Sequence, residues 1–311
     1  MQKKDLLSMT DLGAEDILRL IQGAIALKQQ DRRSLLVGKT LALIFEKPSL
    51  RTRVSFEVGM WQLGGQAIYL SQSEVGLGQR ESVSDVARVL SRYVDVIVTR
   101  TFHHRQAQLL AEHATVPVIN GLSDEEHPCQ ALADLLTIYE KKGRLKGVTI
   151  AYVGDANNVA TSLLLGASLV GANFRIASPA GYQLKEGILK QAQSFANQSG
   201  ATIVCTEEPQ AAVRGADIVY TDVWTSMGQE AEAERRRANF VGYQVSAQLL
   251  AQAQEGVLFM HPLPAHHGEE VAPGLIDCPQ SIVFDQAENR LHAQKALLVD
   301  LLGGMRNEAS P

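Results

Sequence analysis

A short run of hydroxyl and guanidinium side chains is the first part of the chain that could bind a small molecule: Ser49, Leu50, Arg51, Thr52 and Arg53. The run follows an apolar segment typical of a strand and precedes one typical of a helix. Serine suits the N-cap of a helix, whose first N–H groups carry partial positive charge. Together with the planar fork of Arg51, these groups predict a phosphate site. A capped helix with solvated arginines is the alternative interpretation.

The next candidate residues, His127 and Gln130, stand beside Pro128 at the start of a second helical pattern. Proline suits the first turn of a helix and Gly143 suits its end, so we predict a helix over 128–142. The histidine can donate a hydrogen bond to a carbonyl oxygen, and the glutamine amide can donate and accept in one plane. The pair suits a planar NH2–C=O group. A histidine that only caps the helix would give the same pattern.

Two strand-to-helix turns in the second half of the chain suit an amino-acid substrate. Residues 154–158 read Gly-Asp-Ala-Asn-Asn and lack the Gly-x-Gly-x-x-Gly pattern of a dinucleotide site, which argues against a dehydrogenase. Asparagine amides suit a zwitterionic head, although asparagine is also a common turn former. Residues 222–230 follow another predicted strand, and Asp222 offers a carboxylate to an ammonium group. The polar run 229–237 is interpreted as a mobile shoulder of this loop or as a solvated face.

Three histidines lie close together in the sequence: His261, His266 and His267. They have no cysteine partner, and such spacing on a loop is more typical of turn or solvent contacts than of zinc binding. The three cysteines of the chain stand far apart without Cys-x-x-Cys spacing, which fits a reducing compartment. We therefore predict no metal site.

These motifs, and their order along the chain, resemble those of the family of aspartate and ornithine carbamoyltransferases. The resemblance spans essentially the whole chain and is carried by Ser-x-Arg-Thr-Arg at 49–53, His-Pro-x-Gln at 127–130, Ser-Met-Gly at 226–228 and further segments at 81–90, 118–124, 261–270 and 284–292. Two positions depart from the family pattern. Pro262 stands where ornithine-specific members usually have cysteine. Gly76 stands where a loop, 73–80, usually presents a polar side chain to the neighbouring subunit, a role that Gln79 or Arg80 could take.

The resemblance implies transfer of a carbamoyl group from carbamoyl phosphate to the side-chain amine of L-ornithine, giving L-citrulline and phosphate without a metal or an organic cofactor. Asp222 favours ornithine over aspartate, because a second substrate carboxylate would need a cation there. The resemblance also implies a homotrimer, or a multiple of one, and a place in arginine biosynthesis. A carbamoyltransferase for putrescine or an acylated ornithine, and a non-catalytic ligand sensor, are the alternatives.

The resemblance further implies roles for individual residues. The carbamoyl phosphate site would consist of Ser49, Leu50, Arg51, Thr52, Arg100, His127, Gln130, Leu263 and Arg290. Its catalytic members, facing the oxyanion of the reaction, would be Thr52, Arg100, His127 and Arg290. The ornithine site would consist of Asn158, Asp222, Ser226 and the backbone of Met227. Leu263 would contribute only its carbonyl group, a role with which Pro262 is compatible, and Arg53 would be structural.

Helices and strands must hold these residues in place. Apolar runs typical of strands alternate with helical patterns along the chain. The pattern predicts an α/β protein of two doubly wound parallel-sheet domains with the active site in the cleft between them. Strands are predicted at 40–45, 67–70, 94–99, 116–120, 148–153, 174–177, 202–205, 218–221, 257–260 and 282–284. We place the carbamoyl phosphate domain at 1–135 and the ornithine domain at 136–286. A final helix, at about 287–311, is expected to pack back on the first domain.

The helix that follows Ser49 carries two apolar stripes. One stripe comprises Val54, Val58 and Trp61, and the other comprises Phe56, Met60 and Leu63. A helix that is apolar on more than one side is expected to be largely buried, which would hold the preceding turn rigidly.

Composition narrows the function classes. The chain has 311 residues, of which 45% are hydrophobic, and its net charge is −5. A chain of this length can bury a large core, and its negative charge argues against a general nucleic-acid binder. The N-terminus lacks the pattern of a signal peptide, and no apolar stretch approaches the roughly 18 residues of a membrane span. We therefore expect a cytoplasmic enzyme with small-molecule substrates.

Overall fold

The computed structural model describes residues 5–29, 34–226 and 228–303 and divides into two compact units. Unit 1 comprises Met1–Leu136 and Glu288–Pro311, and unit 2 comprises Thr137–Ala287. The division falls within helix α6 (Pro128–Lys142) and again within helix α12 (Val283–Leu301). Each unit therefore holds its own sheet and its own set of candidate residues.

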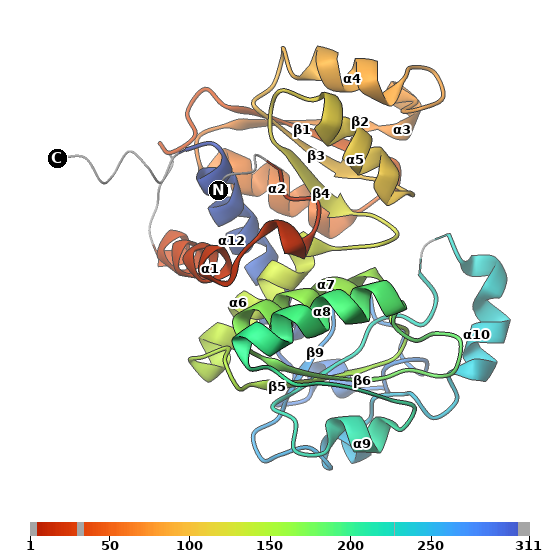
Figure 1. Cartoon of the computed structure of the whole chain (residues 1–311). Helices are drawn as coiled ribbons and strands as arrows, with labels where there is room; N and C mark the ends of the chain where they lie inside the picture. The colour runs from red at the N-terminus through yellow and green to blue at the C-terminus, as the bar shows by residue number, and fades with distance from the viewer. Residues whose placement is uncertain (1–4, 30–33, 227, 304–311) are drawn as a thin grey trace. The chain divides into compact units, whose positions relative to one another are not determined.

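Unit 1 is a four-stranded parallel sheet in the order β2-β1-β3-β4 (Figure 1). Its strands are β1 (Thr40–Phe45), β2 (Gln66–Ser71), β3 (Val96–Arg100) and β4 (Val118–Leu122). Its helices are η1 (Met9–Asp11), α1 (Ala14–Gln29), α2 (Leu50–Gln62), α3 (Gln72–Val75), α4 (Val83–Leu90) and α5 (His104–His113). Helices α4 and α5 cover one sheet face, where Val86 and Leu110 pack with Ala42, Ile44 and Ile97.

The strand order of unit 1 reverses beside β1. From β1 the chain passes to β2 on one side and then returns to β3 on the other side. Loops that leave the carboxyl ends of two such strands diverge, and ligands of open α/β sheets bind in the crevice between them. Phe45, the last residue of β1, pairs with Arg100, the last residue of β3. The turn that begins α2 and the end of β3 are therefore neighbours.

Unit 2 is a five-stranded parallel sheet in the order β7-β6-β5-β8-β9. Its strands are β5 (Thr149–Val153), β6 (Asn173–Ala177), β7 (Ile203–Thr206), β8 (Ile218–Tyr220) and β9 (Leu258–Met260). Its helices are α7 (Asn158–Val170), α8 (Glu186–Ser199), α9 (Pro209–Val213), η2 (Glu230–Glu232), α10 (Ala233–Asn239), α11 (Ala247–Leu250) and η3 (Leu275–Asp277). Helices α7 and α8 lie on one face of this sheet and α9 lies on the other (Figure 1). The strand order reverses beside β5.

Gly154 makes the turn out of β5 possible. Its φ is +139°, and a Cβ built on it would lie 3.5 Å from Oγ1 of Thr221 and 3.8 Å from the carbonyl oxygen of Asp222. Residues other than glycine rarely adopt this backbone conformation. The positive φ, rather than a lack of space for a Cβ, is therefore what favours glycine in the turn from β5 toward α7.

The structure confirms the two parallel-sheet α/β domains and corrects two expectations. The predicted strand 282–284 is wrong, because α12 begins at Val283 and only Ser281 makes an isolated bridge, to Phe259. The burial expected for both stripes of α2 is half wrong. Phe56 and Met60 are fully buried, but the stripe of Val54, Val58 and Trp61 is exposed within the single chain, with Trp61 at 62%. None of the helices in the described ranges is long and apolar enough to cross a bilayer.

Candidate active site

The N-terminus of α2 is formed as the sequence predicts. Ser49 is the N-cap, in extended conformation, and its hydroxyl accepts a hydrogen bond from the Thr52 N–H at 3.2 Å. Thr52 is fully buried, and its Oγ1 accepts a hydrogen bond from Nη2 of Arg290 at 2.8 Å. Arg53 has different partners: it pairs with Glu57 at 2.9 Å and lies 3.8 Å from the centre of the Tyr69 ring. Hydrogen bonds therefore connect the N-cap Ser49 to Thr52 and Thr52 to Arg290.

Positive charge gathers at this turn. Arg100 is 5% exposed, and burial together with the nearby charges of Arg290 and Arg51 lowers its pKa to about 9. Its Nε is buried with no hydrogen-bond partner in the part of the chain that the structure describes. Like charges held close together at a buried position favour binding of an anion. Three predicted ligands of carbamoyl phosphate, Arg51 from α2, Arg100 from β3 and Arg290 from α12, therefore form one cationic group.

His127 lies against the same group, just before α6. The side chain is 4% exposed, and burial together with the charges of Arg290 and Arg100 lowers its pKa well below the usual value. The imidazole is therefore neutral at pH 7, with one N–H to donate and one nitrogen to accept. A neutral histidine can donate to a carbonyl oxygen without adding to the repulsion among the arginines.

Gln130 lies one turn into the junction helix α6. Its Nε2 donates to Oδ1 of Asp134 at 2.8 Å, and its Oε1 is buried with no hydrogen-bond partner among the described residues. The Oε1 of this amide is therefore an acceptor that a ligand could use. The adjacent Cys129 is buried, which raises the pKa of its thiol to about 12, so this thiol is protonated at neutral pH and is not a nucleophile.

The loop that carries His127 is anchored by residues that the sequence reasoning did not single out. The buried carboxylate of Glu126 accepts hydrogen bonds from the Met9 N–H at 3.0 Å and from the Ser8 hydroxyl. Asn120 donates from Nδ2 to the carbonyl oxygen of Leu7 at 3.0 Å. No local pattern marks these contacts, because they join segments more than 100 residues apart in the chain.

In unit 2, the turn after β5 and the end of β8 are joined by Asn157. This residue is the N-cap of α7, where its Oδ1 accepts from the N–H groups of Val159 and Ala160. Its Nδ2 donates to Oδ2 of Asp222 at 2.8 Å. Sequence reasoning selected the next residue, Asn158, which is the first residue of α7 and half-buried. Asn157 was missed as a site residue because a turn-forming asparagine gives no sign of its tertiary partner.

Asp222 is a buried carboxylate at the switch point of unit 2. Burial raises its pKa, while nearby His261 and the hydrogen bond from Asn157 act in the opposite direction. The Val223 N–H also donates to it, at 2.8 Å. A buried carboxylate is stabilised by a cationic partner, so this position suits an ammonium group. Of the other predicted residues of this loop, Ser226 donates its N–H to Oε1 of Gln229 at 3.1 Å, and Met227 lies outside the described residues.

His261 holds the segment that contains Leu263. The Leu263 N–H donates to Nδ1 of His261 at 2.9 Å, so the imidazole proton is on Nε2, which faces Oε1 of Glu270 at 3.1 Å. Leu263 itself has a φ of +57°. His261 therefore acts within the fold by fixing the backbone around the predicted Leu263 carbonyl.

A group of possible metal ligands lies on the same segment. His266, Glu269 and Glu270 place ligand atoms within 4.8 Å of one another. Each carboxylate has a protein partner: Glu269 pairs with Arg237 at 2.9 Å, and Glu270 accepts from His261 and from the His266 N–H. This bonding already accounts for the arrangement of the two acids.

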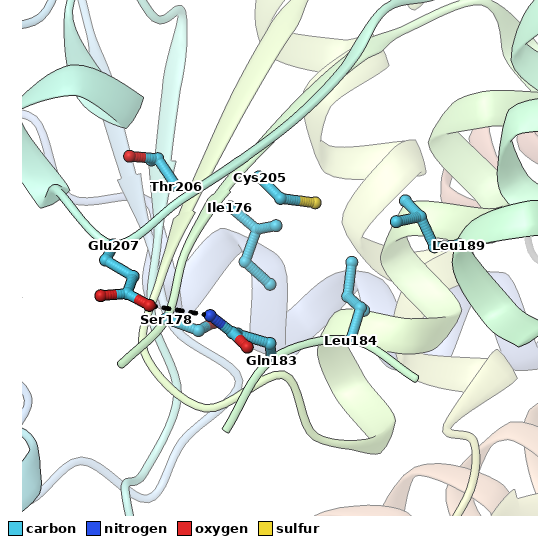
Figure 2. A pocket seen from close by; sticks show the side chains of 8 residues that line it. All are labelled: Ile176, Ser178, Gln183, Leu184, Leu189, Cys205, Thr206 and Glu207. Carbon is cyan, nitrogen blue, oxygen red and sulfur yellow. Dashed lines mark hydrogen bonds between the residues drawn. The ribbon is translucent and has the colours of Figure 1, made fainter. Parts of the chain in front are cut away.

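A separate cavity of about 410 Å³ lies at the carboxyl ends of β6 and β7 (Figure 2). It is lined by Ile176, Ser178, Gln183, Leu184, Leu189, Cys205, Thr206 and Glu207, none of which was predicted as a site residue. Gln183 donates to Glu207 at 3.0 Å, and the Ser178 hydroxyl donates to the Gly154 carbonyl at 2.7 Å. Because these polar groups bond to the protein, the candidate site remains at the two switch points.

Comparisons with known proteins match both units. A family model described as the carbamoyl-P binding domain of aspartate/ornithine carbamoyltransferase matches residues 4–140, and one described as its Asp/Orn binding domain matches residues 146–301. The ornithine carbamoyltransferase of Anoxybacillus flavithermus is 56% identical over 306 residues, covering 97% of this chain and 98% of that protein. The solved structure of the ornithine carbamoyltransferase of Pyrococcus furiosus has a TM-score of 0.93 and 53% identity, covering 96% of this chain and 97% of that one.

The lowered pKa of His127 predicts a pH dependence of stability. Because the pKa is lower in the folded than in the unfolded chain, the unfolded chain binds the extra proton, and stability is lost as the pH falls below about 6.5. We expect His127→Gln to reduce the fall in unfolding free energy between pH 7.5 and 5.5, measured by urea denaturation. His113→Gln, at the end of α5, is the control and should keep the wild-type slope. An unchanged slope in His127→Gln would contradict the assignment of a neutral imidazole.

Proposed function

The chain belongs to the aspartate/ornithine carbamoyltransferase family, and on that premise we propose that it transfers the carbamoyl group of carbamoyl phosphate to the side-chain amine of L-ornithine, giving L-citrulline and phosphate. The observation that carries the proposal is the contrast between the two switch points. Unit 1 gathers cationic groups around Thr52, and unit 2 buries the carboxylate of Asp222. A dianionic donor and an amine acceptor match these two charges.

The phosphate group is assigned to the first turn of α2. Ser49, Leu50, Arg51 and Thr52 supply the N-terminal N–H groups of the helix, two hydroxyl groups and a guanidinium. Anions bind at such helix ends because N–H groups and the helix dipole both favour negative charge. Burial and the neighbouring charges of Arg290 and Arg51 lower the pKa of Arg100, which supports this assignment, since a bound dianion would offset both effects.

The carbamoyl group is assigned to side chains of complementary hydrogen-bonding type. Neutral His127, Arg100 and Arg290 are donors for its carbonyl oxygen. The buried Oε1 of Gln130 is an acceptor for its NH2 group, and the carbonyl of Leu263 is assigned the same role. Both ends of a planar amide are matched in this way.

The amino acid is assigned to unit 2, with Asn158, Asp222, Ser226 and Met227 as its ligands. Asp222 would pair with an ammonium group, and the half-buried amide of Asn158 at the start of α7 would bind the carboxylate. The hydrogen bond between Asn157 and Asp222 supports a shared site, because it fixes the acid next to the turn that carries Asn158.

Transfer requires both substrates to be bound together. The neutral side-chain amine attacks the carbamoyl carbon, a C–N bond forms, and negative charge moves to the carbonyl oxygen. Thr52, Arg100, His127 and Arg290 stabilise that oxyanion, and one well-placed donor of this kind lowers a barrier by about 3–4 kcal/mol. The C–O bond to phosphate then breaks, and the leaving phosphate takes the proton of the amine. The protein supplies position and charge, and no group of the chain becomes covalently modified.

A homotrimer, or a multiple of one, is the proposed assembly. Large apolar side chains gather in an exposed row on α2: Leu50, Val54, Val58 and Trp61. An exposed apolar row of this kind is typical of a protein interface. The row runs along the helix whose first turn is assigned to phosphate, so a neighbouring subunit packed on it would hold that turn in place. A relative from Pyrococcus furiosus, 52% identical, is named anabolic, which supports a role in arginine biosynthesis.

We expect Arg51→Ala to lower kcat/KM for carbamoyl phosphate by about 100-fold or more, because it removes the guanidinium from the first turn of α2. The matched control is Arg53→Ala on the same helix, since Arg53 pairs with Glu57 instead; it should stay within about threefold of wild type. Citrulline formation at varied carbamoyl phosphate gives both values. Near-normal kinetics for Arg51→Ala would remove the basis of the phosphate assignment.

We expect L-ornithine to be preferred over L-aspartate by about 1,000-fold or more in kcat/KM. Aspartate would place its extra carboxylate near buried Asp222, and such a pair of like charges is costly in a closed site. The measurement is carbamoyl transfer with a panel of ornithine, aspartate, putrescine and acetylornithine. Faster turnover of any other amine would replace ornithine as the acceptor, and binding without turnover would favour a sensor.

We expect the wild-type protein to run in light-scattering chromatography at about three times its chain mass of 33.8 kDa. Trp61→Glu should yield smaller species, because it places a charge in the apolar row of α2. Val241→Glu is the matched control, since Val241 is 78% exposed on unit 2. A monomeric wild type, or an unaffected Trp61→Glu variant, would contradict the assembly.

A further inference from the structure

The guanidinium of Arg236 is buried in unit 2 although it comes from the polar run 229–237. Its Nη1 donates to Oδ2 of Asp155 at 2.7 Å and to the carbonyl oxygen of Trp224 at 2.9 Å. Its Nε donates to Glu232 at 3.1 Å, and the guanidinium lies 4.9 Å from the centre of the Tyr182 ring. The side chain is 7% exposed, so the interpretation of the run as a solvated face is wrong at this position.

The two segments that Arg236 joins are those that carry the proposed amino-acid ligands. Asp155 stands between Gly154 and the asparagines at the start of α7. Trp224 stands between Asp222 and Ser226. Both are loop residues that follow strands, so no sheet hydrogen bonds fix the distance between them. The Arg236 guanidinium, which has an acceptor in each segment, links them in addition to the hydrogen bond from Asn157 to Asp222.

Packing around Arg236 reinforces the link. The Trp224 ring stacks on Phe240, with centres 5.5 Å apart, and Phe240 follows α10 directly. The Ala156 N–H donates to the carbonyl of Tyr182 at 3.0 Å, and the Tyr182 ring contacts both Arg236 and Phe240. The loop after β8, the turn after β5 and α10 therefore share one packed cluster. Burial raises the pKa of Asp155, whereas its pairing with Arg236 acts in the opposite direction.

We propose that Arg236 is a positioning residue for the amino-acid substrate: by bridging Asp155 and the Trp224 carbonyl, it holds the loop of Asp222 and Ser226 at a fixed distance from the turn of Asn157 and Asn158. The inference rests on the proposed function, because it concerns the acceptor half of that reaction. A planar guanidinium donates to two acceptors at once, which a lysine ammonium cannot reproduce in the same geometry. Binding of carbamoyl phosphate to unit 1 does not use this bridge.

The test compares Arg236→Met, Arg236→Lys and Arg235→Met. Arg235 is the matched control, because it neighbours Arg236 but is 67% exposed and pairs with the Glu232 carboxylate. We expect Arg236→Met to raise the KM for ornithine by about tenfold or more, Arg236→Lys to recover part of that loss, and Arg235→Met to match wild type. The dissociation constant of carbamoyl phosphate, measured by calorimetry, should stay within about twofold in all three variants.

A second comparison separates positioning from general stability. In a double-mutant cycle, Asp155→Asn added to Arg236→Met should raise the ornithine KM by much less than the product of the single effects, because both changes break one bridge. The inference would be overturned if Arg236→Met weakened the binding of ornithine and of carbamoyl phosphate equally, or if the two substitutions had additive effects in the cycle. An unchanged ornithine KM in folded Arg236→Met would overturn it as well. If Arg236→Met fails to fold, Arg236→Lys carries the same comparison. Absence of citrulline formation by the wild type would instead overturn the proposed function.

Discussion

Repulsion among buried positive charges is the interaction on which the organisation of unit 1 depends. Arg51, Arg100 and Arg290 come from α2, β3 and α12, and burial together with the charges of the other two arginines lowers the pKa of Arg100. Holding them together costs free energy, so each must be fixed by its own element: a capped helix start, a buried strand end and a helix that returns from the other end of the chain. Neutral His127 adds a donor to this group without adding charge. Together these features favour binding of an anion.

Unit 2 has the same kind of switch point, with the opposite charge beside it. Strand order reverses beside β1 in one unit and beside β5 in the other, so each sheet opens a crevice at the carboxyl ends of two neighbouring strands. In unit 1 the flanking loops bring guanidinium groups, and in unit 2 they bring Asp222 and Asn157. The sheet decides where a ligand can bind, and the loop side chains decide its charge. The proposed function accordingly assigns the dianionic donor to one sheet and the amine acceptor to the other.

Supporting contacts at both crevices come from residues distant in the sequence. Glu126 is held by the N-terminal segment, Thr52 by Arg290, and the turn of Asp155 by Arg236. Each contact is buried, and the groups it joins are polar, so the burial is compensated by hydrogen bonding. Pro262 fits this arrangement as well. The backbone of that segment is fixed by His261, which accepts a hydrogen bond from the Leu263 N–H and requires no thiol.

The sequence by itself determined features that depend on short stretches of chain. The helix Pro128–Lys142 matches its prediction, Ser49 is the N-cap of α2, and β1 spans Thr40–Phe45 as predicted, because capping, proline position and apolar runs are local properties. Tertiary structure alone decided which polar groups meet. The exposed side of α2, the helix in place of a strand at Val283, the bond between Asn157 and Asp222 and the burial of Arg236 all depend on surfaces brought together only by folding. A side chain's type shows what it could bind, but its partner is set by which distant segment the sheet places beside it.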